Sequence, residues 1–266
     1  MSGGCINDSR IIETDSGEKY FIKISPSNKS DAFLKEANGL TEIKLAKVIR
    51  TPEVIYFDED ILILEFIASS IRKKNFSEEF GRRFAKMHKH YSEIFGFYEN
   101  NYIGSTPQIN LADDEESLDW TKFYFNKRLL FQFKLAEENG YVDNSFRKLF
   151  AKIENKINLI IDCKDIKPSL LHGDLWGGNY IVDESGNVCL IDPAVYYGHR
   201  EADLAMTKLF GGFDSRFYLA YNDEYPLDDG YEYRENIYKL YHILNHLNLF
   251  GSGYLNQAIN LLNFYT

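Results

Sequence analysis

The first third of the chain alternates apolar and polar positions in short runs, and a period of two is typical of β-strands. The turn-forming tetrapeptide Asp-Ser-Gly-Glu at residues 15–18 separates the first two runs and predicts a hairpin. Between the second run and the third, apolar positions recur at helical spacing. The expected elements are strands over residues 9–14 and 19–25, a helix over residues 31–46, and strands over residues 53–57 and 61–66. Together they predict a mainly β unit that ends near Ile67.

Beyond this unit the apolar period becomes helical. Ser77 is expected to cap the first helix, whose apolar positions follow one face as far as Tyr91. The elements expected next are helices over residues 119–139 and 144–161, a polar loop over residues 172–179, two short strands around the turn at residues 184–187, and helices to the end. This order predicts an α+β fold of two lobes. The small lobe, residues 1–67, holds an antiparallel sheet and one helix, and the larger lobe, residues 68–266, is mainly helical.

Composition narrows the classes of function. Of the 266 residues, 44% are hydrophobic and 26% are charged, which indicates a globular chain and not a disordered one. The net charge of -10 argues against a nucleic-acid partner, because phosphates require a basic face. No apolar run is long enough to span a bilayer and no signal sequence is recognisable, so no membrane association is expected. The three cysteines show no metal-ligand spacing and favour a reducing compartment, so we expect a cytoplasmic protein of unknown oligomeric state.

The strongest chemical signal is His-Gly-Asp-Leu-Trp-Gly-Gly-Asn at residues 172–179, followed by Asp192 between an isoleucine and a proline. Phosphoryl transfer needs a base that orients the attacking hydroxyl group and Mg²⁺ ions that neutralise the phosphates. Asp174 is the expected catalytic base. Asn179 and Asp192 are the expected magnesium ligands, because amide and carboxylate oxygens suit this ion. His172 is expected to order the loop.

Two other interpretations of this segment account for less of its pattern. A capped turn with solvated carboxylates requires neither the spacing from Asp174 to Asn179 nor the spacing to Asp192. A transition-metal site formed by His172 and Asp174 lacks a third ligand at a recognisable spacing. The sequence therefore favours phosphoryl transfer.

The first lobe offers an independent test of this interpretation. Kinases pair a strand lysine with a helix glutamate, which fixes the lysine on the α- and β-phosphates of ATP. Lys23 shares a face of the second predicted strand with Phe21, and the following helix carries Glu36. Gly3 and Gly4 precede the first strand, where a glycine turn can lay backbone N–H groups over phosphates. The pattern G-x-x-x-x-G-K-[ST] does not occur, which excludes a Walker-type NTPase.

These residues resemble the fructosamine kinase family, ketosamine kinases related to aminoglycoside phosphotransferases and choline kinases. Many phosphotransferases share the His-Gly-Asp loop, whereas Asp-Pro-Ala-Val-Tyr-Tyr-Gly at residues 192–198 is specific to the family. The family-like stretches are residues 3–6, 108–110, 171–179, 191–206, 210–213 and 241–249. The resemblance implies a two-lobed protein-kinase-like fold.

The resemblance also implies a reaction, the ATP-dependent phosphorylation of the sugar 3-hydroxyl group in ketosamines, with ATP and Mg²⁺ as cofactors. Ketosamines form when sugars react with amines, and the phosphorylated adduct falls apart, so the family is associated with deglycation. Members accept fructosamines or only ribulosamines and erythrulosamines, and the sequence does not choose between these substrates.

Further residues receive roles from the same resemblance. Glu65, Phe66 and Ile67, at the end of the fourth strand, are expected to bind the nucleotide. Asp203 is expected to brace the catalytic loop, with a solvated carboxylate at a helix start as the alternative. Trp176 either packs on the substrate sugar or closes the loop as a core residue, and the two interpretations are equally supported.

Two rival functions stay open. An aminoglycoside or amino-sugar phosphotransferase shares the catalytic loop but is expected to lack the Tyr-Tyr-Gly segment. A nucleotide-binding pseudokinase is favoured by the start of the chain, because family members usually have another strand and helix before the glycine turn. The residues that oppose a pseudokinase are Lys23, Glu36, Asp174, Asn179 and Asp192.

Overall fold

The computed structural model describes residues 8–25, 31–163 and 165–266. The chain forms two compact units, each assembled from three stretches of sequence. The first unit contains Met1–His90, His172–Val195 and Phe210–Pro226, and the second contains Tyr91–Leu171, Tyr196–Leu209 and Leu227–Thr266. Gly3 and Gly4 lie outside the described residues, so the predicted phosphate loop stays a prediction. The units interleave along the chain, and the lobe boundary expected at residue 67 also stays a prediction.

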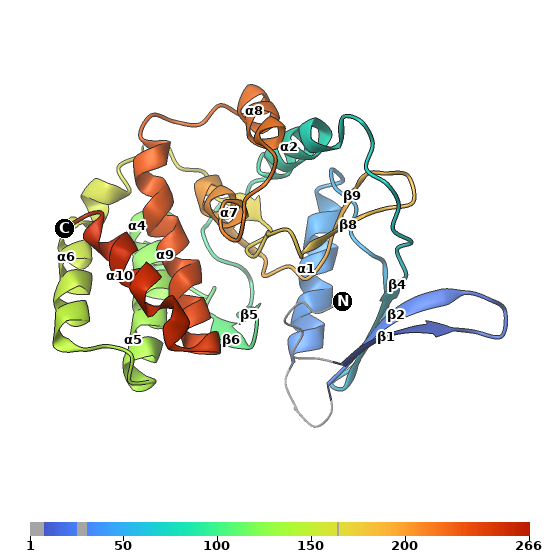
Figure 1. Cartoon of the computed structure of the whole chain (residues 1–266), viewed down its shortest axis with the longest axis horizontal. Coiled ribbons are helices and arrows are strands. Elements are labelled where there is room, and N and C mark those ends of the chain that lie inside the picture. Colours follow the sequence, from blue (N-terminus) through green and yellow to red (C-terminus); the bar gives the residue numbers. More distant parts are fainter. Residues whose placement is uncertain (1–7, 26–30, 164) are drawn as a thin grey trace. The chain divides into compact units, whose positions relative to one another are not determined.

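A four-stranded antiparallel sheet with one helix against it begins the first unit (Figure 1). The strand order is β1-β2-β4-β3. The elements are β1 (Asp8–Glu13), β2 (Lys19–Ile24), α1 (Ala32–Leu45), β3 (Val54–Phe57) and β4 (Ile61–Glu65). Every element that the sequence predicts in this region is present, with each end shifted by a single residue at most.

The alternation of side chains in β2 decides which face of the sheet meets α1. Phe21 pairs in register with Leu64 of β4, and both pack with Phe33 and Leu40 of α1. Side chains two residues apart on a strand share a face, so Lys23 points to the same side as Phe21. The apolar core of the sheet thereby places Lys23 against the helix.

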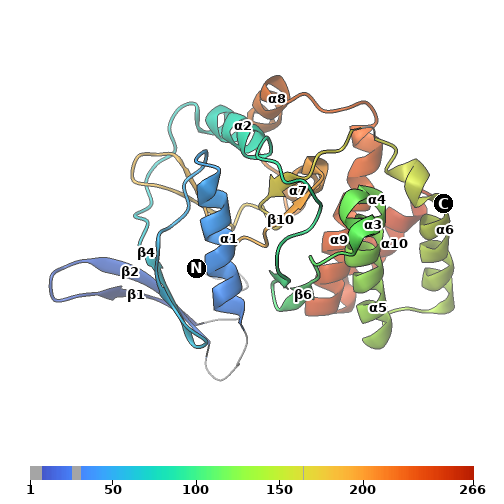
Figure 2. The same ribbon diagram turned by 180° about the vertical axis from the view of Figure 1, so that it is seen from behind.

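Helices α2 (Phe76–Met87) and α8 (Ser215–Glu224) lie side by side in the same unit, as both views show (Figures 1 and 2). Their contact depends on Gly81, because a Cβ atom there would lie 2.2 Å from the carbonyl oxygen of Phe217. Any larger residue would push the helices apart. The glycine therefore sets how closely α2 and α8 approach.

The start of α2 differs from the prediction. The helix begins at Phe76 with Asn75 as its N-cap, so the prediction that Ser77 caps it is wrong. The backbone N–H of Phe76 donates to the carbonyl oxygen of Lys73 at 3.0 Å, and this turn starts the helix earlier. Ser77 is instead a buried residue of the first turn.

The predicted hairpin after the polar loop is present as β8 (Tyr180–Val182) and β9 (Val188–Leu190). Asp183 shapes its turn, because one carboxylate oxygen accepts hydrogen bonds from the N–H groups of Ser185 and Asn187, each at 2.9 Å. The chain leaves β9 directly before Asp192, so this hairpin positions the expected magnesium ligand.

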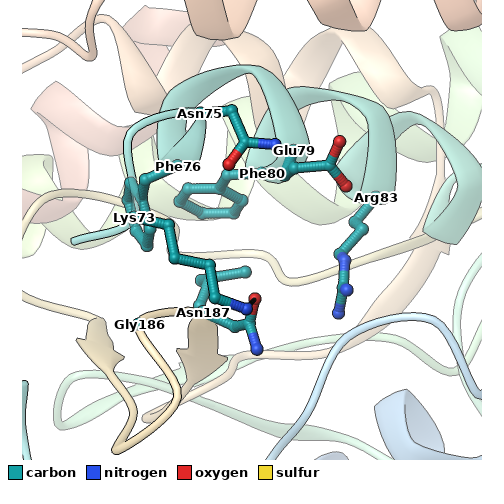
Figure 3. A pocket seen from close by; sticks show the side chains of 9 residues that line it. Lys73, Asn75, Phe76, Glu79, Phe80, Arg83, Gly186 and Asn187 are labelled. Atoms are coloured by element: carbon teal, nitrogen blue, oxygen red, sulfur yellow. Dashed lines mark hydrogen bonds between the residues drawn. The ribbon is translucent and has the colours of Figure 1, made fainter.

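The segment before α2 holds this turn. The N–H of Lys73 donates to the carbonyl oxygen of Gly186 at 3.3 Å, and its ammonium group donates to the amide oxygen of Asn187 at 3.0 Å. Figure 3 shows Lys73 beside Asn187 at a small pocket, with Arg83 extending from α2. The hairpin is thus anchored to the start of α2.

The second unit is mostly helical, and its helices α5, α6, α9 and α10 can be followed in Figure 2. Its elements are β5 (Asn101–Ile103), β6 (Thr106–Gln108), α3 (Asp114–Leu118), α4 (Trp120–Tyr124), the π-helix η1 (Phe125–Leu130), α5 (Phe131–Glu138), α6 (Asn144–Ile160), β7 (Ser169–Leu171), β10 (Tyr196–Gly198), α7 (Arg200–Thr207), α9 (Tyr231–Phe250), the 3₁₀-helix η2 (Ser252–Tyr254) and α10 (Leu255–Asn263). No helix of the described residues is long and apolar enough to cross a membrane.

Two features of this unit correct the sequence prediction. The chain after the hairpin is not wholly helical, because β10 pairs with β7, and strands of three residues are too short to show a period of two. The helix expected over residues 119–139 is divided, with η1 between α4 and α5. A π-helical turn changes the register locally, which an apolar pattern with a period of 3.6 does not reveal. It carries Arg128, which donates to the carbonyl oxygen of Ile109 at 2.5 Å.

Candidate active site

Lys23 is the centre of a charged cluster in the first unit. Its ammonium nitrogen Nζ donates to Oε1 of Glu36 at 2.7 Å and, more closely, to Oδ1 of Asp192. Strand β2 supplies the lysine, α1 supplies the glutamate, and the segment after β9 supplies the aspartate. The structure therefore brings together three residues that the sequence separates by as many as 169 positions. Their role in nucleotide binding stays a prediction.

Burial and charge act against each other in this cluster. The side chains of Lys23, Glu36 and Asp192 are 7%, 15% and 35% exposed. Burial disfavours the ammonium ion, but the two carboxylates outweigh burial and raise the pKa of Lys23 above its ordinary value. Burial also raises the pKa of Glu36, against the opposing charge of Lys23. Two carboxylates share one ammonium group, so the ionised cluster has an excess negative charge that favours a further cation.

The backbone of the His-Gly-Asp loop is pinned to the segment after Asp192. The N–H of Ala194 donates to the carbonyl oxygen of His172 at 2.8 Å. Gly173 has a φ of +82°, and a Cβ atom there would lie 1.9 Å from the carbonyl oxygen of Ala194. Only glycine fits this approach, which explains why the loop reads His-Gly-Asp.

The His172 imidazole makes a second connection between the same two segments. Its Nδ1 accepts a hydrogen bond from the N–H of Asp174 at 3.3 Å, and its Nε2 lies 3.0 Å from the carbonyl oxygen of Ile191. The ring proton is therefore assigned to Nε2, because the carbonyl oxygen of Ile191 can only accept a hydrogen bond and Nδ1 already accepts one. His172 thus joins Asp174 to the residue before Asp192, as expected of a residue that orders the loop.

Asn179 holds the side chain of Asp174. Its amide nitrogen donates to the backbone oxygen of Asp174 at 2.8 Å and to the carboxylate oxygen Oδ2 at 3.2 Å. Its backbone oxygen accepts from the N–H of Ile191 at 3.1 Å. In the described part of the chain, no donor binds the amide oxygen Oδ1 of Asn179. That oxygen and the carboxylate of Asp192 are hard oxygen ligands, so these two residues fit a magnesium ion.

Asp192 also has an unusual backbone conformation. Its φ of 54° lies in the left-handed region, which residues other than glycine rarely adopt. Such conformations concentrate at functional sites, where the surrounding contacts hold them. Here those contacts include the close hydrogen bond from Lys23.

The three residues at the end of β4 that are expected to bind the nucleotide have different surroundings. The Glu65 carboxylate is used within the protein, because it accepts from the N–H of Glu53 at 3.1 Å and pairs with Arg50 at 2.6 Å. Phe66 and Ile67 directly follow the last residue of β4. Nucleotide binding by this segment remains a prediction.

Arg50 is a residue of this site that sequence reasoning missed. Its guanidinium group pairs with Glu65 at 2.6 Å, with Glu184 at 2.7 Å and with Asp183 at 3.4 Å. Burial disfavours its charge, but the hydrogen bonds to Glu184 and Glu65 outweigh burial and raise its pKa. Arg50 thereby connects the end of β4 to the hairpin that leads to Asp192. No local signal marks it, because its partners are at least 15 residues away.

The ring of Trp176 is half-buried beside the catalytic loop. It lies so close to Gly178 that a Cβ atom there would be 2.4 Å from the ring. Its edge faces Phe210, with 6.4 Å between the ring centroids. Because the ring is partly packed and partly accessible, its contact with a substrate sugar stays a prediction.

Asp203 lies on α7 in the second unit and is 1% exposed. The alternative of a solvated carboxylate at a helix start is therefore wrong. The expected support of the catalytic loop by Asp203 stays a prediction.

Comparison with known proteins identifies the family. A model of the fructosamine kinase family matches residues 1–265. The chain belongs to the fructosamine kinase family. The protein-ribulosamine 3-kinase of Arabidopsis thaliana, described as chloroplastic, is 41% identical over 273 residues, which cover 100% of this chain and 81% of that protein. As a member of a kinase family, the chain uses ATP.

Solved structures confirm the predicted fold. A protein from Haemophilus somnus 129PT named as a fructosamine-3-kinase has a TM-score of 0.88 and 27% identity, over 100% of this chain and 89% of that one. A thermostable mutant of an aminoglycoside phosphotransferase has a TM-score of 0.60 and 13% identity, over 100% of this chain and 91% of that one. The second likeness shows the fold alone. The α+β kinase-like fold and the family resemblance predicted from the sequence are thus confirmed.

Proposed function

We propose that this fructosamine kinase is a ketosamine 3-kinase, which transfers the γ-phosphoryl group of ATP to the 3-hydroxyl group of the sugar in a ketosamine. The observation that carries the proposal is the assembly of Asp174, Asn179 and the Lys23 cluster in one unit. The ketosamine acceptor is supported by the family match and by the relative named protein-ribulosamine 3-kinase.

Asp174 acts as the catalytic base in this proposal. Asn179 holds one of its carboxylate oxygens, and the backbone bond to His172 fixes the start of the loop. A base fixed in this way orients the acceptor hydroxyl group and receives its proton as the group attacks. The base then carries the proton, and ADP leaves as the bond between the β–γ bridging oxygen and the γ-phosphorus breaks.

Lys23 contributes charge to the same step. Its ammonium group is held between Glu36 and Asp192, so it stays protonated and stays in place. A protonated lysine at this position binds the oxygens of the α- and β-phosphates. We assign magnesium to the oxygens of Asn179 and Asp192, where the ion neutralises charge on the phosphates.

We also propose a cytoplasmic location, on the behaviour of the cysteines. Among the described residues, neither Cys163 nor Cys189 forms a disulfide bond, and Cys5 lies outside that part of the chain. Burial raises the pKa of Cys189 to about 12, so this thiol stays protonated and unreactive. A buried, protonated thiol such as Cys189 suits a reducing compartment.

The proposed function is tested by measuring ADP formation with ribulose-lysine, fructose-lysine and an aminoglycoside as acceptors. We expect turnover with at least one ketosamine and none with the aminoglycoside, and the Asp174→Asn variant serves as the control. Turnover confined to the aminoglycoside would assign the chain to the rival phosphotransferase class. ATP binding without turnover of any acceptor would favour the pseudokinase.

A further inference from the structure

A second and larger pocket lies in the first unit, next to the catalytic loop. It is formed by the segment before α2, the start of α2, the loop after Asp174, the start of β8 and the segment leading into α8. Its lining residues are Arg72, Phe76, Ser77, Phe80, Gly177, Tyr180, Gly212, Phe213, Asp214 and Phe217. None of the residues assigned to catalysis lines it.

Half of the residues that line the pocket are aromatic. Phe80 is the central ring, with centroids 5.3 Å from Tyr180, 5.5 Å from Phe213 and 5.0 Å from Phe217. Phe80 and Phe217 are buried, whereas Tyr180 and Phe213 are half-buried and present part of their rings. Such a wall binds a flat or apolar group, because aromatic faces offer a large contact area in fixed orientations.

The rim of the pocket carries a cation with spare hydrogen-bonding capacity. The guanidinium group of Arg72 stacks 5.1 Å from the ring of Phe76 and donates to the hydroxyl group of Tyr180 at 2.7 Å. In the described part of the chain, no carboxylate forms an ion pair with Arg72. The other charged lining residue, Asp214, pairs with Arg216 at 2.7 Å, and Arg216 also lies 3.5 Å from Glu78. The pocket therefore favours a ligand that has an anionic group beside an apolar body.

The pocket lies within reach of the proposed reaction. Gly177 lines it and follows Asp174 by only three residues, a separation that cannot exceed about 11 Å even in extended chain. In a ketosamine, the amine component is attached a few bonds from the 3-hydroxyl group. An acceptor whose hydroxyl group meets Asp174 can therefore extend its amine component toward the aromatic wall.

We propose that this pocket binds the amine component of the acceptor and selects ketosamines derived from amino acids with an aromatic or apolar side chain. The side chain of the amino acid packs against Phe213 and Tyr180, and its carboxylate binds Arg72. This inference rests on the proposed function, because it concerns the acceptor of the same reaction.

The test compares ribulose adducts of phenylalanine, phenethylamine and glycine as acceptors. The first two differ only in the carboxylate, and the third lacks the ring. The protein variants are Arg72→Gln, Phe213→Leu and the control Arg82→Gln, which changes an exposed arginine on α2 that does not line the pocket. The measurement is kcat/KM for each adduct, with KM and kcat separated.

We expect the phenylalanine adduct to exceed the phenethylamine adduct by about tenfold in kcat/KM, since one charge-assisted hydrogen bond is worth about that much. Arg72→Gln should remove this preference through KM, and Arg82→Gln should keep it. Phe213→Leu should lower kcat/KM about fivefold for both ring-containing adducts and leave the glycine adduct unchanged. Equal values for the three adducts, or a carboxylate preference that survives in Arg72→Gln, would overturn the inference.

Failure of the proposed function gives a different result. If no adduct is phosphorylated by the wild-type chain, the proposed function fails, and the pocket is then tested by calorimetric binding of the phenylalanine and glycine adducts. Tighter binding of the phenylalanine adduct that is lost in Arg72→Gln supports the pocket. Binding that does not distinguish the two adducts, or absence of binding, contradicts it.

Discussion

Each unit of this kinase contains a buried ion-pair cluster, and the two clusters differ in how completely their charges are satisfied. In the first unit, the single ammonium group of Lys23 is shared by Glu36 and Asp192, and Asp192 is 35% exposed. In the second unit, Arg234 and Glu201 pair at 2.6 Å, with side chains that are 3% and 0% exposed. The first cluster has excess negative charge and a partly exposed carboxylate, whereas the Arg234–Glu201 pair is balanced in charge and closed to solvent.

In the second unit, the charges of Arg234 and Glu201 already compensate each other, so no ligand is needed to balance them. Arg234 binds both carboxylate oxygens of Glu201 and donates to the carbonyl oxygen of Asp229 at 2.8 Å. Among the described residues, Cys163, His199, Glu201 and Asp228 each place one possible metal-ligand atom within 4.8 Å of the others. Burial raises the pKa of the Cys163 thiol to about 11, so this thiol is a poor metal ligand at neutral pH. The Glu201 carboxylate is already paired with the guanidinium group of Arg234. We therefore interpret this cluster as structural.

The comparison shows that chemical residue types alone do not mark an active site. Both clusters contain buried carboxylates and a basic partner. What distinguishes the first is incomplete compensation, because two carboxylates per ammonium group leave a net negative charge that a bound cation can neutralise. The predictions below change one cluster or the other.

The largest effect is expected for Asp174→Asn. Removing the base should lower kcat by about 10²–10⁴-fold and leave ATP binding largely intact, because the side chain acts in the chemical step. Steady-state kinetics with calorimetric ATP binding measure both quantities. Near-normal turnover in this variant would refute the assignment of Asp174 as the base.

Arg234→Met should affect stability and not chemistry. It leaves the fully buried Glu201 carboxylate without its partner, so the free energy of unfolding should fall by about 3–5 kcal/mol. Denaturant unfolding measures this change, and the double variant Arg234→Met with Glu201→Leu should recover much of it. A loss below about 1 kcal/mol would show that the pair is not the structural element described here.

Glu36→Gln should weaken the first cluster without unfolding it. The amide oxygen can still accept from Lys23, but the lysine is held less firmly, and we expect kcat/KM for ATP to fall about 10²-fold through misplacement. The matched control is Glu13→Gln, a change at an exposed glutamate of β1. Equal kinetics in the two variants would contradict the role assigned to the pair.

The buried side chain of His242 should make the free energy of unfolding depend on pH. Burial, helped by nearby His246 and Arg128, lowers its pKa from 6.5 to about 3 in the folded protein. As the pH falls, the unfolded chain therefore takes up this proton at a higher pH than the folded protein does. The contribution of His242 to the free energy of unfolding is complete above pH 6.5 and is lost as the pH falls toward 3. Between these two pKa values, the free energy of unfolding is expected to fall by about 1.4 kcal/mol for each pH unit.

His242→Gln should remove that slope, and unfolding free energies measured between pH 7 and pH 4.5 provide the comparison. His90→Gln serves as a control for loss of a histidine elsewhere in the chain. Parallel pH profiles for the wild type and His242→Gln would show that the buried histidine does not titrate as described.

The smallest effect is expected for Arg50→Gln. The side chain of Arg50 is 33% exposed, and those of its partners Glu65 and Glu184 are 32% and 53% exposed, so screening by solvent limits the loss of unfolding free energy to about 1 kcal/mol or less. A thermal melt measures this loss, and Arg82→Gln is the control. A loss well above that limit would show that the connection between β4 and the hairpin is a main support of the unit.

The catalytic motif was readable from the sequence because its residues are close together in the chain. His172, Asp174 and Asn179 share one loop, and Gly173 is required by its φ of +82° and its contact with Ala194. The Lys23 and Glu36 assignments came from a period of two in β2 followed by a helix. These signals lie within short segments of the chain, so they can be recognised without knowledge of the fold.

Features that depend on distant contacts could not be read in this way. Arg50 has partners on β4 and on the β8–β9 hairpin, and nothing in its neighbourhood indicates either. The π-helix η1 and the pairing of β10 with β7 depend on packing in the second unit. The N-cap of α2 was misplaced because the turn at Lys73, and not the preference of Ser77, determines where the helix begins.

The measurement that tests the central claim most directly is the capture of Mn²⁺, as a paramagnetic substitute for magnesium, in the presence of ATP. Electron paramagnetic resonance follows free Mn²⁺ with the wild-type chain, Asp192→Asn and Asp228→Asn, which alter one carboxylate in each cluster. We predict capture by the wild type and by Asp228→Asn, and affinity at least about tenfold weaker in Asp192→Asn. Capture that survives in Asp192→Asn and disappears in Asp228→Asn would contradict the account.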